Sequence, residues 1–228
     1  DVDIVFCNAQ EFDENSGRTF NLYRRPSGIE EGAALKLDSI EKRKEIMPFH
    51  LPPWAKIVRA NLIKQQNVRF SVGENKFDDI TFHYHLAMVA DTVCYIDDVL
   101  YTHRFFKESI SGEYTNRGEK MITDKLITWA ELEELSKQNG LEIKQILAPY
   151  LKEFYCCIHI SPNVKKHADA VRRIIKRNSL AEEDLTGSQL KYYKTLKRFG
   201  PFYRLYFLLK RRHKHLKKSV KSVFSWLF

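Results

Sequence analysis

An acidic pair, Asp78-Asp79, stands at the start of a segment with helical periodicity. Three apolar residues of the range 79–89 recur at three- and four-residue spacing: Phe82, Leu86 and Val89. This spacing predicts a helix with one apolar stripe. A carboxylate can take the proton of a hydroxyl nucleophile, so Asp79 and Asp78 are of a residue type that could do acid–base chemistry. In the alternative interpretation the two acids only cap the helix, because acids suit the positive end of its dipole.

Other side chains near this pair are candidates for substrate binding. Trp54 offers a flat apolar face and Lys56 a cation for a phosphate. A core aromatic and a solvated charge are the alternatives. His83 follows Asp79 by four residues and shares its helix face, so it either adjusts that carboxylate or is a partly exposed helix residue. His83 and His85 are two apart and point to different sides of the helix, so we expect no metal site there.

Four motifs follow one another in a fixed order. They are PWAKIVR at 53–59, VRFSVG at 68–73, FDDITF at 77–82 and YIDDVLYTHR at 95–104. This order resembles the second half of family 2 glycosyltransferases of the GT-A fold. In that family Pro-Trp-x-Lys precedes a Phe-x-x-Gly loop, an acidic pair at a helix start, and a pair of strands. The resemblance covers residues 1–111, and four motifs in register are stronger than any one of them.

The resemblance implies an inverting transfer of a sugar from a nucleotide-sugar donor to a glycan or lipid-linked acceptor, in bacterial cell-surface polysaccharide synthesis. A hydroxyl is a poor nucleophile at neutral pH, so a carboxylate takes its proton as it attacks the anomeric carbon. By the family pattern Asp79 is this base, and Asp78 replaces the usual Glu. The expected substrate-binding residues are Trp54, Lys56, His83 and Arg104.

The front of the family pattern has no counterpart here. In the family, about a hundred residues of alternating strands and helices bind the nucleotide and end in an Asp-x-Asp motif that holds Mn²⁺ or Mg²⁺. Asp1-Val2-Asp3 matches that motif in letters but opens a strand, so we interpret the match as coincidence. We therefore expect a fragment or processed chain that binds no metal and is inactive alone. The alternative function is a non-catalytic interaction or membrane-docking module derived from a glycosyltransferase.

The periodicity predicts an α/β fold with a partial, GT-A-like mixed sheet, followed by a helical C-terminal region. Strands are expected at 3–7, 19–24, 93–96 and 99–104, with a turn at 15–17. Helices are expected at 37–47 (N-cap Asp38), 60–66, 79–89, 115–138, 141–160 and 164–177. The expected domains are an acceptor-side half at 1–112, a helical domain at 113–198 and a basic tail at 199–228.

The positive charge is concentrated in that tail. The chain of 228 residues has a net charge of +9, but residues 1–190 carry 26 basic and 29 acidic side chains. A helix at 214–228 would have one apolar face ringed by lysines, a pattern typical of a helix lying on an anionic membrane. Alternatively the apolar face packs on the protein body or on a second copy in a homo-oligomer. The acidic body disfavours nucleic acid as a partner.

Cysteine usage and hydropathy indicate the compartment. None of the four cysteines forms a Cys-x-x-Cys or Cys/His spacing, which favours a reducing environment. The sequence has no recognisable signal peptide and no apolar run near the ~20 residues of a spanning helix. We therefore expect a cytoplasmic protein, peripheral on the inner face of the cell membrane.

Overall fold

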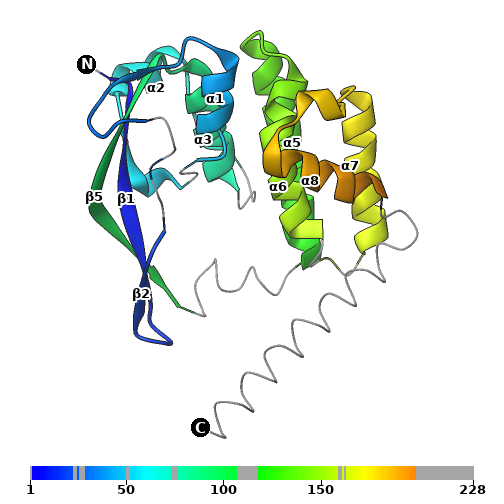
Figure 1. Cartoon of the computed structure of the whole chain (residues 1–228), viewed down its shortest axis with the longest axis horizontal. Helices are drawn as coiled ribbons and strands as arrows, with labels where there is room; N and C mark the ends of the chain where they lie inside the picture. Colours follow the sequence, from blue (N-terminus) through cyan, green and yellow to red (C-terminus); the bar gives the residue numbers. More distant parts are fainter. Residues whose placement is uncertain are drawn as a thin grey trace, which may run out of the picture.

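A mixed sheet organises the first half of the chain. The computed structural model describes residues 2–22, 25, 29–49, 52–72, 77–106, 118–158, 161 and 163–198. Strand β1 (Ile4–Asp13) lies centrally and β5 (Thr92–Phe105) runs parallel beside it. Strands β2 (Arg18–Asn21) and β4 (Lys56–Val58) pair antiparallel with the two ends of β1, and β3 (Leu35–Lys36) pairs antiparallel with β5. The order is β2-β1-β5-β3 (Figure 1), which confirms the expected α/β class with a mixed sheet.

Strand β1 is longer than the apolar stretch that predicted it. β1 continues past the predicted 3–7 because its second half pairs with both β2 and β5. The turn at 15–17 is confirmed, with Gly17 at φ 66° and the Asp13 carboxylate accepting from Asn15 and Ser16. These local hydrogen bonds close the β1–β2 hairpin.

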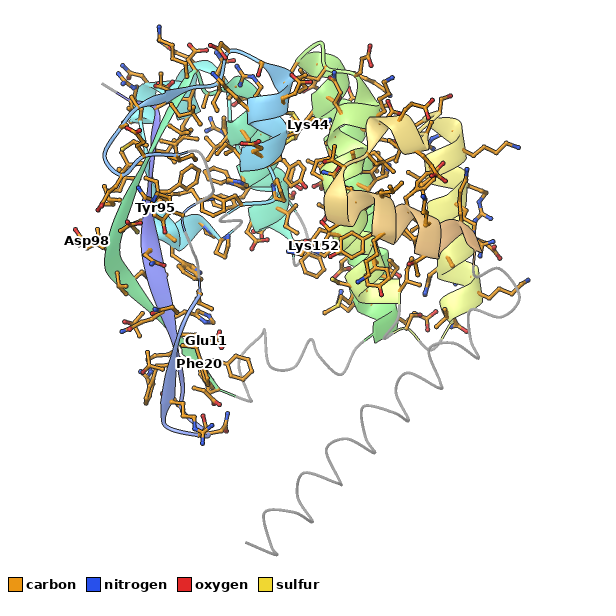
Figure 2. The ribbon with its side chains drawn as sticks, viewed as in Figure 1. Glu11, Phe20, Lys44, Tyr95, Asp98 and Lys152 are labelled. Carbon is orange, nitrogen blue, oxygen red and sulfur yellow. The ribbon has the colours of Figure 1, made fainter. Side chains whose placement is uncertain are left out.

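The prediction of two strands at 93–96 and 99–104 is wrong, because β5 is continuous. Cys7 pairs with Ile96 and Asn8 with Val99, so the register shifts and Asp97-Asp98 are accommodated as a bulge. Asp98 lies on the outer side of the bent strand (Figure 2). Adjacent acids are typical of a turn, but here the residues before and after the two acids both pair with β1, and this pairing keeps the chain extended.

Three helices accompany the sheet: α1 (Ile40–Ile46), α2 (Ala60–Gln65) and α3 (Asp78–Val89). A short 3₁₀ turn, η1 (Pro53–Ala55), leads into β4. The expected N-cap at Asp38 is wrong, since Ser39 Oγ accepts from the Lys42 N–H and the helix starts one residue later. Arg43 of α1 donates to the carbonyl oxygens of Ala87, Met88 and Ala90, which attaches α1 to the end of α3.

A helical region follows the sheet, as expected. It comprises α5 (Gly118–Gln138), α6 (Ile143–Ile158), α7 (Val164–Arg177), a 3₁₀ turn η2 (Glu182–Asp184) and α8 (Gly187–Arg198). Helix α7 has the predicted bounds, whereas α8 was not predicted. One hydrophobic cluster joins the two halves, and the rings of Tyr84 in α3 and Tyr150 in α6 pack edge to face at 5.9 Å.

Two expectations depend on residues that the structure does not describe. The domain boundary at 112 falls within residues 107–117, and the whole basic tail, 199–228, lies outside the described residues. Within the described ranges, no helix combines the length and the apolar character needed to cross a membrane.

Candidate functional site

The acidic pair occupies the first turn of α3. Asp78 Oδ1 accepts from the backbone N–H of Asp79 at 3.0 Å, and Asp79 Oδ1 accepts from that of Ile80 at 2.8 Å. Each carboxylate thus accepts from the N–H of the residue that follows it, and the Ile80 N–H also donates to the Phe77 carbonyl oxygen. Each of these bonds uses one oxygen of its carboxylate, so the local hydrogen bonds do not by themselves exclude a second role.

Asp79 lies in surroundings that favour its protonated form. Burial raises the pKa of Asp79 above the usual 3.8, and the negative charge of Asp78 adds to the rise. The nearby Lys125 and Lys56 and the Ile80 N–H oppose it. A carboxylate with a raised pKa is better matched to accepting a proton near neutral pH.

The structure brings two predicted site residues, Lys56 and His83, into hydrogen-bond contact. Nζ of Lys56 lies 2.7 Å from Nδ1 of His83, and Nε2 of His83 lies 2.9 Å from the carbonyl oxygen of Ile46. Because a carbonyl oxygen only accepts, Nε2 carries the hydrogen and Nδ1 accepts from the Lys56 amine. His83 is fully buried, so the interpretation as a partly exposed residue is wrong. His83 is buried because α3 packs against β4 and α1.

The Lys56 amine is itself perturbed. Its removal from water lowers the pKa of Lys56 from 10.5 to about 7, although the negative charge of Asp79 acts in the opposite direction. The amine lies 5.6 Å from the centroid of the Phe6 ring on β1. Lys56 is therefore not the solvated charge of the alternative interpretation. Near neutral pH it is present in both protonation states beside an acid whose pKa is raised.

A second lysine, Lys125, is buried, approaches the same helix end and was not predicted. Nζ of Lys125 on α5 lies 3.5 Å from the Phe77 ring centroid and 2.8 Å from Glu153 Oε2 on α6. The side chain of Lys125 is 3% exposed. Its sequence signal is its position between Ile122 and Trp129, on the buried stripe of α5. A lysine in an apolar stripe indicates a buried ion pair or a site, since lysine is rarely buried unpaired.

Trp54 lies against the sheet. Its ring stacks on Tyr101 at 4.6 Å and on His103 at 5.4 Å, with interplanar angles of 15° and 8°. Trp54 is partly buried and belongs to a small cluster with Cys7 and Ala9. The stacking supports the interpretation as a packed aromatic.

Arg104 lies toward the far end of the sheet. It is paired in register with Phe12 and donates from Nε to Glu14 Oε1 at 2.8 Å, with its side chain 71% exposed. The preceding His103 contacts Glu11, which Figure 2 shows in the lower part of β1, beyond the helices. Among the described contacts, Arg104 binds the β1–β2 hairpin rather than the α3 start.

Asp3 is the aspartate of the Asp-x-Asp match that the structure describes, and its carboxylate connects the start of β1 to the start of β5. Its Oδ2 accepts from the backbone N–H groups of Asp91 and Thr92, and its Oδ1 lies 3.2 Å from Arg59 Nε. This supports the interpretation of the motif as coincidence. In the described part of the chain, no three His, Cys, Asp or Glu side chains form a group that could hold a metal.

Comparison with known proteins adds no relative. No protein-family model matches the chain, and the search of curated proteins finds no match to it.

Proposed function

We propose that this chain is the acceptor-side part of an inverting glycosyltransferase, with Asp79 as the general base. The observation that carries the proposal is the half-buried Asp79 carboxylate of raised pKa, held at the start of α3 beside two lysines. The motif order of residues 53–104 supports it independently. Nucleotide binding and the divalent metal belong, by the same resemblance, to a part upstream of this segment.

In this mechanism Asp79 orients and then deprotonates the acceptor hydroxyl. The hydroxyl oxygen forms a bond to the anomeric carbon, its proton goes to the Asp79 carboxylate, and the bond to the diphosphate oxygen breaks with its electron pair. Attack opposite the leaving group inverts the anomeric centre. Lys56 and Lys125 limit how far the Asp79 pKa rises, so that enough of the carboxylate stays ionised to accept a proton.

The test is transfer by the longest natural protein that contains this segment, assayed with UDP-sugars and Mn²⁺. Asp79→Asn removes the base but keeps the side-chain shape, so we expect transfer to fall by about 10²–10⁴-fold. Asp98→Asn, on the exposed bulge, is the matched control and retains activity. Unchanged turnover in Asp79→Asn with an intact fold would refute the assignment.

A calorimetric titration separates donor binding from the base. We expect UDP-sugar and Mn²⁺ to bind the longer protein and not this chain alone. Binding by neither would favour a non-catalytic module or a different donor. The local hydrogen bonds of Asp78 and Asp79 to the backbone of the first turn of α3 are the observation that favours the non-catalytic alternative.

The basic tail supports a location at the membrane surface. Its amphipathic pattern favours contact with anionic lipid at the cytoplasmic face, where each basic residue contributes about 1 kcal/mol. Removing residues 199–228 is expected to release the protein from phosphatidylserine vesicles. Equal sedimentation of the two forms with these vesicles would contradict membrane contact through the tail.

A further inference from the structure

A polar hollow lies between α3 and α5, on a different side of α3 from His83. It has a volume of about 560 Å³ and is lined by the end of α2, the segment that follows it, two residues of α3 and the second half of α5. Figure 1 shows α3 and α5 side by side. Ile46 and Lys56 contact His83 on one side of α3, whereas Thr81 and His85 line the hollow. The hollow is therefore separate from the base proposed above.

Phe70 gives the hollow an aromatic surface. Its ring stacks on Phe82 of α3 with centroids 4.1 Å apart and planes at 5°, while the residue is 43% exposed. Since Phe82 covers one face of the ring, the exposed area belongs to the other face and the edge. A flat, preformed aromatic face suits the apolar C–H face of a pyranose ring.

His85 supplies a buried polar group directed at the hollow. It is 8% exposed and lines the hollow, and it has no hydrogen-bond partner among the residues that the structure describes. Burial lowers the pKa of His85, so the ring is neutral near neutral pH and offers one donor and one acceptor. Its ring nitrogens are not among the buried side-chain atoms that lack a hydrogen-bond partner, so they reach the surface of the hollow, where a ligand or water can bind them.

Glu131 is held in a fixed orientation at the centre of the lining. Its Oε2 accepts from Ser71 Oγ at 2.5 Å and from Thr81 Oγ1 at 2.8 Å, so one oxygen is used and the carboxylate is positioned. Five carboxamide side chains complete the polar lining: Gln65, Gln66, Asn67, Gln138 and Asn139. Carboxamides both donate and accept, as sugar hydroxyls do.

The charges of the lining disfavour an anionic ligand. Among the lining residues that the structure describes, Arg69 is the one lysine or arginine, against the carboxylates of Glu131 and Glu134. A phosphate or nucleic acid would meet a net negative surface, whereas a neutral polyhydroxyl compound would not.

We propose that this hollow binds a neutral oligosaccharide, with Phe70 stacking on a sugar ring and His85 and Glu131 hydrogen-bonding its hydroxyls. The choice of a saccharide over another neutral polar ligand rests on the proposed function. The site would bind sugar units of the acceptor that are distant from its reacting hydroxyl. Its occupancy does not require the transfer step.

The test is NMR titration of this chain, labelled with ¹³C in its leucine methyl groups, with maltotetraose, cellotetraose and chitotetraose. Leu135 lines the hollow and reports binding, and the 61% exposed Leu100 on β5 is the reference signal. We expect at least one tetrasaccharide to shift Leu135 saturably, with a Kd near about 1 mM, and to leave Leu100 unchanged. Inorganic phosphate at the same concentration is expected to shift neither.

Variants separate binding from folding. His85→Phe keeps an aromatic ring but removes both ring nitrogens, and Gln138→Ala changes a surface side chain, so each is expected to weaken binding while the fold persists. The expected loss is about tenfold for His85→Phe. Phe70→Ala is compared with Phe20→Ala, since Phe20 is 49% exposed on β2 and lies far from α5 in Figure 2. Phe20→Ala is expected to bind as the wild type does.

Two results would overturn the inference: no tetrasaccharide shifts Leu135 up to about 20 mM, or His85→Phe binds as tightly as the wild type. The result of this binding test does not depend on whether Asp79 is the catalytic base. Asp79→Asn is expected to keep saccharide binding, so binding without transfer would refute the proposed function alone. Transfer without binding in the hollow would refute this inference alone.

Discussion

Substituting Lys56 by Met should change how stability depends on pH. In the folded chain the pKa of this amine is lowered from 10.5 to about 7 because burial disfavours the charge. Between these two values the unfolded chain binds more protons than the folded chain, so the stability of the wild type rises with pH across this window. Below about pH 7 both states are protonated and the penalty is constant. Lys56→Met has no such proton and loses this rise.

The size of the effect follows from the difference between the two pKa values. Each unit corresponds to about 1.4 kcal/mol, so the whole difference is at most ~5 kcal/mol. Between about pH 7 and pH 9.5 the rise is ~3 kcal/mol for a single isolated group. Lys56 is partly exposed, and solvent screening reduces the expected rise to about 1.5 kcal/mol. Loss of the hydrogen bond from Lys56 to His83 costs about 1 kcal/mol at every pH. The diagnostic quantity is therefore how the free energy of unfolding changes with pH, and not its value at one pH.

Urea denaturation of the two proteins across this pH range measures the difference. Titrating groups that both proteins share, such as Tyr95, cancel in the comparison. Lys64→Met removes an exposed lysine of α2 and is the control, expected to run parallel to the wild type. Parallel curves for Lys56→Met and the wild type would show that the Lys56 amine titrates normally, and would refute the reasoning.

Three further substitutions test other contacts. Glu153→Gln removes the carboxylate that accepts from the buried Lys125 ammonium and should lower the free energy of unfolding by about 3 kcal/mol in urea; a loss below about 1 kcal/mol would mean that the pair is solvated. Arg43→Met removes the donor to three carbonyl oxygens at the end of α3, which should cost about 2 kcal/mol and speed hydrogen exchange in its last turn; unchanged exchange would contradict this. Asp3→Ala removes the acceptor of two N–H groups and the carboxylate beside Arg59, and a fall in Tm is expected, whereas an unchanged Tm would count against an anchoring role.

Local patterns predicted much of the secondary structure. Helix α7 was predicted with its observed bounds, because helical periodicity is a property of neighbouring residues. The acids at 78–79 likewise predicted where α3 begins. Gly17 predicted the hairpin turn, since a positive φ is a local requirement.

Elements that depend on distant partners were missed. β4 is three residues long and exists because Phe6 and Lys56 pair across 50 positions of sequence. The strand β5 stays continuous through its bulge because residues before and after Asp97-Asp98 pair with β1. No pattern within either segment carries that information, because the energy of a ladder belongs to the pair of strands.

For the candidate site, the sequence by itself determined which residue types were available and put Asp78 and Asp79 at a helix start. Only the tertiary structure decided their surroundings. It buries His83 against Ile46 and Lys56, and it brings Lys125 from another helix to the same end of α3. The pKa values of Lys56 and Asp79 follow from this burial, since desolvation depends on what covers a group in space and not on its neighbours in the chain.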